Sequence, residues 1–111
     1  QMHTFPCENG NEFPKNQYTK WFDYDKIKGT LSLRHRQPGD YLTLPSGGRK
    51  TLKSWMIDEK IPRQEREEIW LLAEEKHILW IVGHRISAYY KITEQTKTIL
   101  EVEFNGGKSS G

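Results

Sequence analysis

Strands dominate the pattern of apolar and polar positions along the chain. From residue 30 to residue 36, leucine alternates with polar side chains, which is the period of a half-buried strand. Residues 98–104 alternate in the same way, with Glu101 and Glu103 on the polar side. Apolar runs elsewhere indicate further strands. The pattern therefore predicts strands at residues 30–36, 41–44, 69–73, 78–82, 86–92 and 98–104.

Turn residues separate several of these strands. Pro38 and Gly39 suit a type II turn, because proline sets the first central dihedral angle and glycine accepts the positive φ at the second. The strands on either side of this turn are therefore expected to close a hairpin-like unit. Residues 74–77 are expected to form the loop of another hairpin, between two continuous apolar runs.

One helix is expected between residues 50 and 59. Leu52, Trp55 and Met56 are spaced like the buried stripe of an amphipathic helix. Pro62 marks its end, because proline disfavours helical geometry at the residue before it. Together with the strands, this helix predicts an α+β fold that is mainly β, with one inserted helix.

A shorter helical turn is expected at residues 63–68. Pro62 lies near its first position, where the missing N–H of proline is not needed. Arg63 precedes Glu67 by four residues, so the two side chains are placed to pair.

Composition indicates one globular domain with an aromatic-rich core. The chain has 111 residues, of which 34% are hydrophobic and 29% charged, and it contains 4 Trp, 5 Tyr and 4 Phe. This length is enough for a single modest core. Trp55, Trp70 and Trp80 are expected in that core first and as base-stacking platforms second, since proteins that bind single strands expose their aromatic side chains.

The chain is expected to divide into a leader, a body and a tail. Residues 1–16 show no sustained period and are interpreted as a leader or linker, with poor order left open. Residues 17–104 form the body, and residues 105–111 form a flexible tail. No apolar run approaches the roughly 20 residues of a membrane helix, and no secretory signal is recognisable. A cytoplasmic location with no membrane partner is therefore expected.

Positive charge is concentrated in one segment. The whole chain has a net charge of +2, but residues 34–66 hold eight Arg or Lys against four Asp or Glu, a local +4 that leaves −2 for the remainder. Lys50, Lys53 and Lys60 fall on one arc of the expected helix, with Lys60 at or past its end. Such segregation attracts phosphate and predicts binding that weakens with salt. The alternative interpretation is an ordinary solvated face.

Sequence patterns typical of catalytic and metal sites are missing. Residues 46–51 superficially resemble a phosphate-binding loop, but Arg49 stands where a glycine must precede the lysine. The four histidines have no paired spacing, and Cys7 is the only cysteine. No metal site and no internal disulfide are therefore predicted. No catalytic residue is assigned, and enzymatic activity is not expected in this chain alone.

Four short motifs follow one another in a characteristic order. They are Arg34-His35-Arg36-Gln37-Pro38-Gly39-Asp40, Gly48-Arg49-Lys50-Thr51-Leu52-Lys53, Lys60-Ile61-Pro62-Arg63 and Trp80-Ile81-Val82-Gly83-His84-Arg85-Ile86-Ser87. In this order and spacing they resemble the C-terminal domain of bacterial tRNA(Ile)-lysidine synthetases, which attach lysine to an anticodon cytidine of an isoleucine tRNA. The resemblance covers residues 22–104.

This resemblance implies an enzyme of three parts. In the family, an N-terminal ATP-pyrophosphatase domain adenylates the cytidine with ATP and Mg, a middle domain is helical, and the final domain helps to hold the tRNA by its acceptor stem. The parent enzyme would be an ATP-dependent carbon–nitrogen ligase, and this chain would carry no cofactor itself. The implied partners are tRNA(Ile) and the missing N-terminal and middle domains, and a homodimer is left open. The implied fold is a layered β-rich module similar to one in phenylalanyl-tRNA synthetase β chains.

Basic side chains of the recognised segment are the candidates for RNA contact. A-form RNA hides its base edges in a deep groove, so a rigid scaffold with spaced cations is suited to its phosphates. Arginine can donate two parallel hydrogen bonds to one phosphate, whereas lysine adds a mobile point charge. The candidates are Arg34, Arg36, Lys50, Lys53, Lys60, Arg63, Arg66 and Arg85.

Other roles for the same segment stay open at this point. The basic face could dock an acidic surface of the parent enzyme, or form a dimer, without any contact to RNA. Asp40 is expected either to cap the turn or to anchor Arg36. Gly39, Gly48, Pro62 and Gly83 are interpreted as determinants of the fold.

Overall fold

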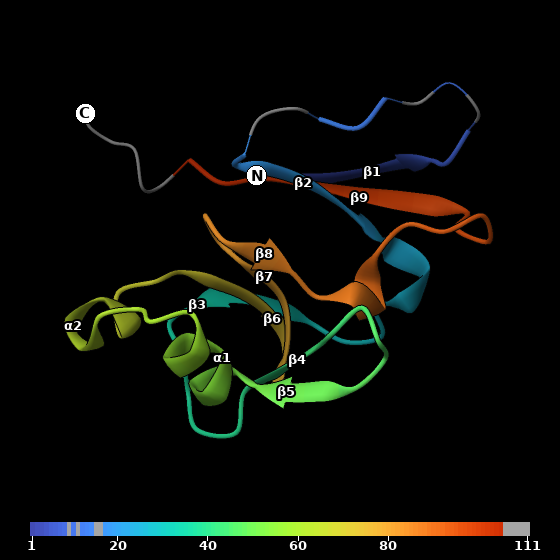
Figure 1. Cartoon of the computed structure of the whole chain (residues 1–111). Helices are drawn as coiled ribbons and strands as arrows, with labels where there is room; N and C mark the ends of the chain where they lie inside the picture. Colours follow the sequence, from blue (N-terminus) through green and yellow to red (C-terminus); the bar gives the residue numbers. More distant parts are fainter. Residues whose placement is uncertain (9, 11, 15–16, 106–111) are drawn as a thin grey trace. The chain divides into compact units, whose positions relative to one another are not determined.

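The computed structural model describes residues 1–8, 10, 12–14 and 17–105 (Figure 1). These residues belong to two compact units. The first unit combines the N-terminal residues up to Ile27 with the C-terminal residues from Tyr90 onward, and the second runs from Lys28 to Tyr89. Residues 106–111 of the expected tail lie outside the described residues.

The first unit is built on a three-stranded antiparallel sheet among the described residues. Strand β9 (Thr98–Glu103) lies between β1 (Met2–Pro6) and β2 (Thr19–Asp23). A 3-10 helix, η1 (Tyr24–Lys26), follows β2. Because β9 is the central strand, both Met2 and Lys20 pair with its Val102. The strand predicted at residues 98–104 is thereby confirmed.

Strand β1 lies in the segment where the sequence pattern indicates only a leader or linker. Its side chains are mostly exposed, so its residues show no apolar alternation. Main-chain pairing with β9 holds it instead, and the N–H of Cys7 extends this pairing by donating to the carbonyl of Lys97 at 2.9 Å. The structured part of the chain thus begins earlier than the pattern indicates.

The second unit contains a sheet in the order β3-β6-β7-β4-β5, with β8 paired to β7. Its elements are β3 (Leu31–Arg34), β4 (Tyr41–Thr43), β5 (Arg49–Thr51), α1 (Leu52–Asp58), α2 (Arg63–Arg66), β6 (Leu71–Glu74), β7 (His77–Ile81), β8 (Arg85–Ile86) and the 3-10 helix η2 (Ala88–Tyr90), whose last residue belongs to the first unit. The predicted α+β, mainly β fold class is confirmed. The expected hairpin around residues 74–77 is also present, as β6 and β7.

The turn at Pro38 and Gly39 forms, but it does not close a hairpin. Gly39 has a φ of 90°, and the N–H of Asp40 donates to the carbonyl of Gln37 at 3.2 Å. However, β3 pairs with β6, whereas β4 pairs in parallel with β7 and antiparallel with β5. The prediction of a hairpin-like unit was therefore wrong. The continuous apolar β6 and β7 take the centre of the sheet, and the more polar β3 and β4 flank them.

Two boundaries differ from the sequence pattern. The helix begins at Leu52 rather than near residue 50, because residues 49–51 form β5 and the Thr51 hydroxyl accepts a hydrogen bond from the N–H of Ser54 at 3.1 Å. The strand expected at residues 86–92 is wrong beyond Ile86. Beyond it the N–H of the buried Ser87 still donates to the carbonyl of Leu79 in β7 at 2.8 Å, and η2 follows.

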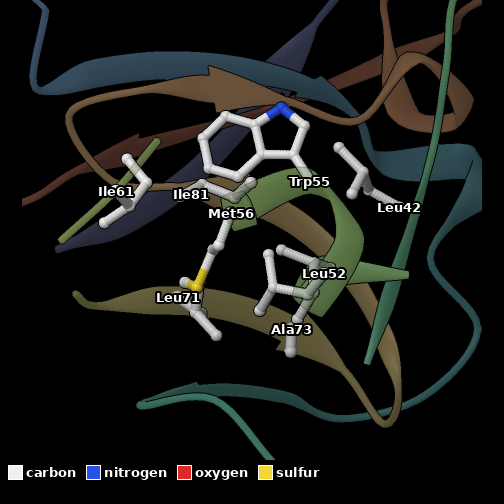
Figure 2. Close-up of a cluster of buried hydrophobic side chains, with 9 residues drawn as sticks. Leu42, Leu52, Trp55, Met56, Ile61, Leu71, Ala73 and Ile81 are labelled. Atoms are coloured by element: carbon white, nitrogen blue, oxygen red, sulfur yellow. The ribbon is translucent and has the colours of Figure 1, made fainter. Parts of the chain in front are cut away.

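The core of the second unit lies between α1 and one face of the sheet (Figure 2). Its buried members are Leu42, Leu52, Trp55, Met56, Ile61, Leu71, Ala73, Ile78 and Ile81. The helix stripe read from the sequence is therefore confirmed. Trp55 and Trp80 are buried as expected, but Trp70 is 37% exposed and stacks on His35 with ring centroids 4.0 Å apart. The prediction that Trp70 belongs to the core was wrong.

Candidate nucleic-acid interface

A groove of about 600 Å³ runs along the second unit between the turn after β3 and the start of α1. It is lined by Arg36, Gln37, Pro38, Gly39, Asp40, Thr51, Leu52, Lys53 and Glu67. Two of the predicted RNA-contacting residues, Arg36 and Lys53, are brought together here from motifs that are separate in the sequence. The groove therefore brings two of the eight candidates together, beside the carboxylates of Asp40 and Glu67.

Arg34 holds the wall of this groove together. Its guanidinium donates to both carboxylate oxygens of Asp40 at 2.9 Å, and to the carbonyls of His35 at 2.9 Å and Glu75 at 2.7 Å. Asp40 also accepts from the N–H of Gln37 at 2.8 Å, and its side chain is only 2% exposed. The expectation that Asp40 caps the turn is confirmed, and the arginine that it anchors is Arg34 rather than Arg36.

Arg36 reaches a different carboxylate. Its Nε and Nη2 donate to Oε2 of Glu67 at 3.0 and 2.8 Å. The predicted pair of Arg63 with Glu67 was wrong, because Glu67 lies just past the end of α2 and turns to the groove. Since β3 ends at Arg34, Arg36 lies beyond the strand that was expected to run to residue 36, and the two arginines bind different carboxylates.

Lys50 and Lys53 take separate positions on either side of the start of α1. Lys50 belongs to β5 and forms an ion pair with Asp58, the last residue of the helix. Lys53 is exposed on the first turn of α1 and has no ion-pair partner among the residues that the structure describes. The expected arc of three lysines on one helix is therefore wrong, because only Lys53 is helical.

Four further candidates lie away from the walls of the groove. Lys60 is exposed past the end of α1, as expected, with a φ of 58°, and Arg63 is exposed as the first residue of α2. The Nε of Arg66 donates to the carbonyl of Ile61 at 2.8 Å. Arg85 is half-buried in β8, where it pairs with Ile81.

Sequence reasoning did not single out two cations that the structure places prominently. Lys76 extends over the turn, where its Nζ donates to the carbonyl of Pro38 at 2.9 Å. Arg49 lies with its guanidinium carbon 4.4 Å from the ring centre of Tyr41. The signal for Arg49 was its place in the charged segment, but only the pairing of β4 with β5 brings it onto this ring.

The loop before Lys50 does not fit a nucleotide. The N–H of Gly47 donates to the carbonyl of Leu44, and the N–H of Leu44 donates to the carbonyl of Gly48, both at 2.8 Å. This loop is a tight connection from β4 to β5, and its backbone does not form an open phosphate cradle. The described residues include no cluster of three or more His, Cys, Asp or Glu that could hold a metal ion. Within the same residues, no helix has the length and apolar character to cross a membrane.

Fold and groove together define a class of protein: a mainly β domain, with two α-helices among the described residues and a groove lined by Arg36 and Lys53 together with Asp40 and Glu67. The chain belongs to the family of the TilS substrate C-terminal domain, whose model matches residues 31–103. The resemblance to the C-terminal domain of tRNA(Ile)-lysidine synthetases is therefore confirmed.

Individual relatives agree with this assignment. The chain is 45% identical over 95 residues to a tRNA(Ile)-lysidine synthase of Caldanaerobacter subterraneus subsp. tengcongensis, a match that covers 85% of this chain and 20% of the relative. It is 41% identical over 97 residues to that of Clostridium tetani, covering 86% and 21%. The chain thus spans about a fifth of the length of these curated relatives.

A solved structure described as the crystal structure of a TILS C-terminal domain has the same fold. It matches with a TM-score of 0.65 and 28% sequence identity, over 91% of this chain and 80% of that one. The expected likeness to a module of phenylalanyl-tRNA synthetase β chains stays a prediction.

Proposed function

We propose that this domain holds tRNA(Ile) for a lysidine-forming ligase by binding the phosphate backbone of the acceptor stem along the groove. One observation carries the proposal: Arg36 and Lys53, from separate motifs, line the same groove on the surface of the second unit. The family supports the choice of ligand, because its curated relatives are tRNA(Ile)-lysidine synthases.

The walls of the groove are rigid enough to recognise a shape. One wall is a turn closed by the Arg34–Asp40 ion pair, whose side chains are 17% and 2% exposed. The other wall is the start of α1, whose Leu52, Trp55 and Met56 are buried in the core. Fixed cations suit an A-form helix, because its accessible surface offers phosphates and 2′-hydroxyls rather than base edges.

Several candidate cations of the second unit, among them Lys53 in the groove, form no ion pair, which favours an anionic ligand. Three of the eight candidates are paired with carboxylates, namely Arg34, Arg36 and Lys50. The other five have no ion pair among the described residues: Lys53, Lys60, Arg63, Arg66 and Arg85. When such cations neutralise phosphates, they release the counterions condensed on the RNA, so binding should weaken steeply as salt is added.

Chemistry of the ligation step belongs, in this proposal, to parts of the parent enzyme that this chain does not contain. Adenylation with ATP and Mg would take place in the N-terminal domain, and this domain would only position the tRNA. Its partners would be tRNA(Ile) and the other domains of the same enzyme, in the cytoplasm. A homodimer would then not be required for the role.

Salt-dependent binding tests the proposal. Affinity for tRNA(Ile) and for an isolated acceptor-stem helix would be measured for the full chain, for Lys53→Ala and for Lys91→Ala, an exposed lysine of the first unit that serves as the matched control. We expect a steep salt dependence, reduced in slope by about one for Lys53→Ala and unchanged for the control.

Two results would contradict the proposal. Equal effects of the two lysine variants would remove the groove as the binding surface. Binding no stronger than that of a neutral control protein, together with binding to the remainder of the parent enzyme, would favour the docking interpretation instead.

A further inference from the structure

An arginine and three aromatic side chains lie in contact as a series in the second unit. The guanidinium carbon of Arg49 lies 4.4 Å from the ring centre of Tyr41. Tyr41 stacks on His77 with ring centroids 4.6 Å apart and planes inclined by 28°. His77 in turn contacts Tyr89 at 5.1 Å. Strands β4, β5 and β7 supply the first three members, so adjacent strands fix their order.

Polar contacts hold the middle of this series in place. Nε2 of His77 lies 3.0 Å from Oγ1 of Thr43 and 3.4 Å from Oγ of Ser87. Ser87 is only 1% exposed, and its Oγ accepts a hydrogen bond from the N–H of Thr43 at 3.0 Å. Burial lowers the pKa of His77, Arg49 lowers it further and Glu74 opposes the shift. The ring beneath Tyr41 therefore favours its uncharged form and does not repel the guanidinium.

Arg49 itself has no carboxylate partner among the described residues, although it is exposed. Its guanidinium instead lies over the ring of Tyr41. A guanidinium over an aromatic ring is held there by the cation–π attraction and keeps its N–H donors in its own plane. These donors match the oxygens of a phosphate, to which arginine can donate two parallel hydrogen bonds.

The position of Arg49 connects it to the groove without making it part of the lining. Thr51, two residues further along β5, lines the groove and caps α1. Alternate residues of a strand lie on the same side and about 7 Å apart. A ribose-phosphate strand that follows the groove past Thr51 would therefore reach the outward edge of the Arg49 guanidinium next.

We propose that Arg49, oriented by Tyr41, is a second RNA-phosphate site that extends the groove along β5. This inference rests on the proposed function, because it assumes that the ligand is RNA. It assigns to Tyr41 and His77 a positioning role: they hold the guanidinium and do not touch the phosphate. The charge of Arg49 and the ring beneath it therefore make separable contributions.

Four variants of the full chain separate these contributions in a salt series with labelled tRNA(Ile). Arg49→Ala should lower affinity roughly three- to tenfold and reduce the salt slope by about one phosphate contact. Arg49→Lys should restore the slope but not the full affinity, because lysine lacks the planar fork. Tyr41→Leu should keep the slope and lose affinity, since the charge remains but its orientation does not. Lys91→Ala should bind like the unmodified chain.

Thermal unfolding of each variant shows whether the fold is kept. Because Arg49 is exposed, its two variants are expected to fold like the unmodified chain. If the unmodified chain binds tRNA but Arg49→Ala binds as Lys91→Ala does, the second site is wrong while the groove proposal stands. If Arg49→Lys binds as well as the unmodified chain, the proposal that the planar guanidinium donates two parallel hydrogen bonds is wrong. If the unmodified chain fails to bind at all, both proposals fail together, and that failure is visible before any substitution.

Discussion

Single carboxylates set how much positive charge the groove presents to a ligand. Glu67 is 64% exposed and holds the Nε and Nη2 of Arg36, whose side chain is 26% exposed. An ion pair as exposed as this contributes little to stability, with a typical value of about 0–1 kcal/mol. Its larger effect is to occupy two donors of an arginine that a phosphate would otherwise use.

Replacing Glu67 should therefore strengthen RNA binding. We expect Glu67→Gln to raise affinity for tRNA(Ile) roughly two- to fivefold, the free-energy scale of an exposed ion pair, with little change in stability. Fluorescence anisotropy at low salt measures the effect. Glu68→Gln is the matched control. It removes the same charge at the next residue, whose side chain does not line the groove. A weaker or unchanged affinity for Glu67→Gln would contradict the competition between carboxylate and phosphate.

The lowered pKa of His77 predicts how the stability of the chain depends on pH. Burial lowers its pKa in the folded chain, whereas the unfolded chain has the ordinary value of 6.5. At low pH the unfolded chain therefore binds a proton at His77 more readily than the folded chain does. The contribution of His77 to the free energy of unfolding is complete above pH 6.5 and decreases as the pH drops below it. In urea unfolding, this decline should be smaller in His77→Gln. Equal pH dependence of the two proteins would show that His77 does not cause it.

At the residue scale, the sequence indicated which cations belong to the basic segment but not how each is used. Arg34 and Arg36 look equivalent in the motif, yet one is tied to the buried Asp40 and the other to the exposed Glu67. Their partners lie 6 and 31 residues away along the chain. Pairing at such different separations depends on the turn and on α2, so local spacing could not predict it.

At the scale of elements, the N-cap residue Thr51 sets the start of α1. The Thr51 hydroxyl accepts from the N–H of Ser54 at 3.1 Å, and Thr51 also ends β5. This residue therefore fixes the junction that places Lys53 in the groove. Losing the cap would loosen the first turn of the helix, which carries Lys53.

Thr51→Ala should accordingly destabilise the chain by about 1 kcal/mol, the usual effect of losing a side-chain N-cap. Ser54→Ala is the control, because it lies on the same turn and donates to the cap through its backbone N–H, which the substitution keeps. Denaturant unfolding compares the two variants. Equal stabilities would mean that the cap does not hold the junction.

Elements with a strong apolar pattern were predictable, and those held by main-chain pairing were not. The stripe of Leu52, Trp55 and Met56 identified the helix, and the apolar runs identified β6 and β7. Strand β1 has mostly exposed side chains and pairs with β9, almost the whole chain away. The turn at Gly39 was recognisable, but the strands that flank it pair elsewhere, because β6 and β7 occupy the centre of the sheet.

At the scale of the whole molecule, the functional motifs and the termini belong to different units. The four motifs lie within the unit from Lys28 to Tyr89, whereas β1, β2 and β9 form the other sheet. The chain spans about a fifth of the length of the two curated relatives described above, and both are tRNA(Ile)-lysidine synthases. An accessory role in holding the tRNA therefore rests, in this proposal, on the groove and on the family.

Chemical-shift mapping tests the central proposal most directly. Backbone amide resonances of the full chain would be followed during titration with an acceptor-stem RNA helix. We expect the largest changes at Gln37, Gly39 and Lys53 along the groove, reversed by added salt. Changes confined to the sheet of β1, β9 and β2, or none at RNA concentrations that saturate a control RNA-binding protein, would contradict binding through the groove.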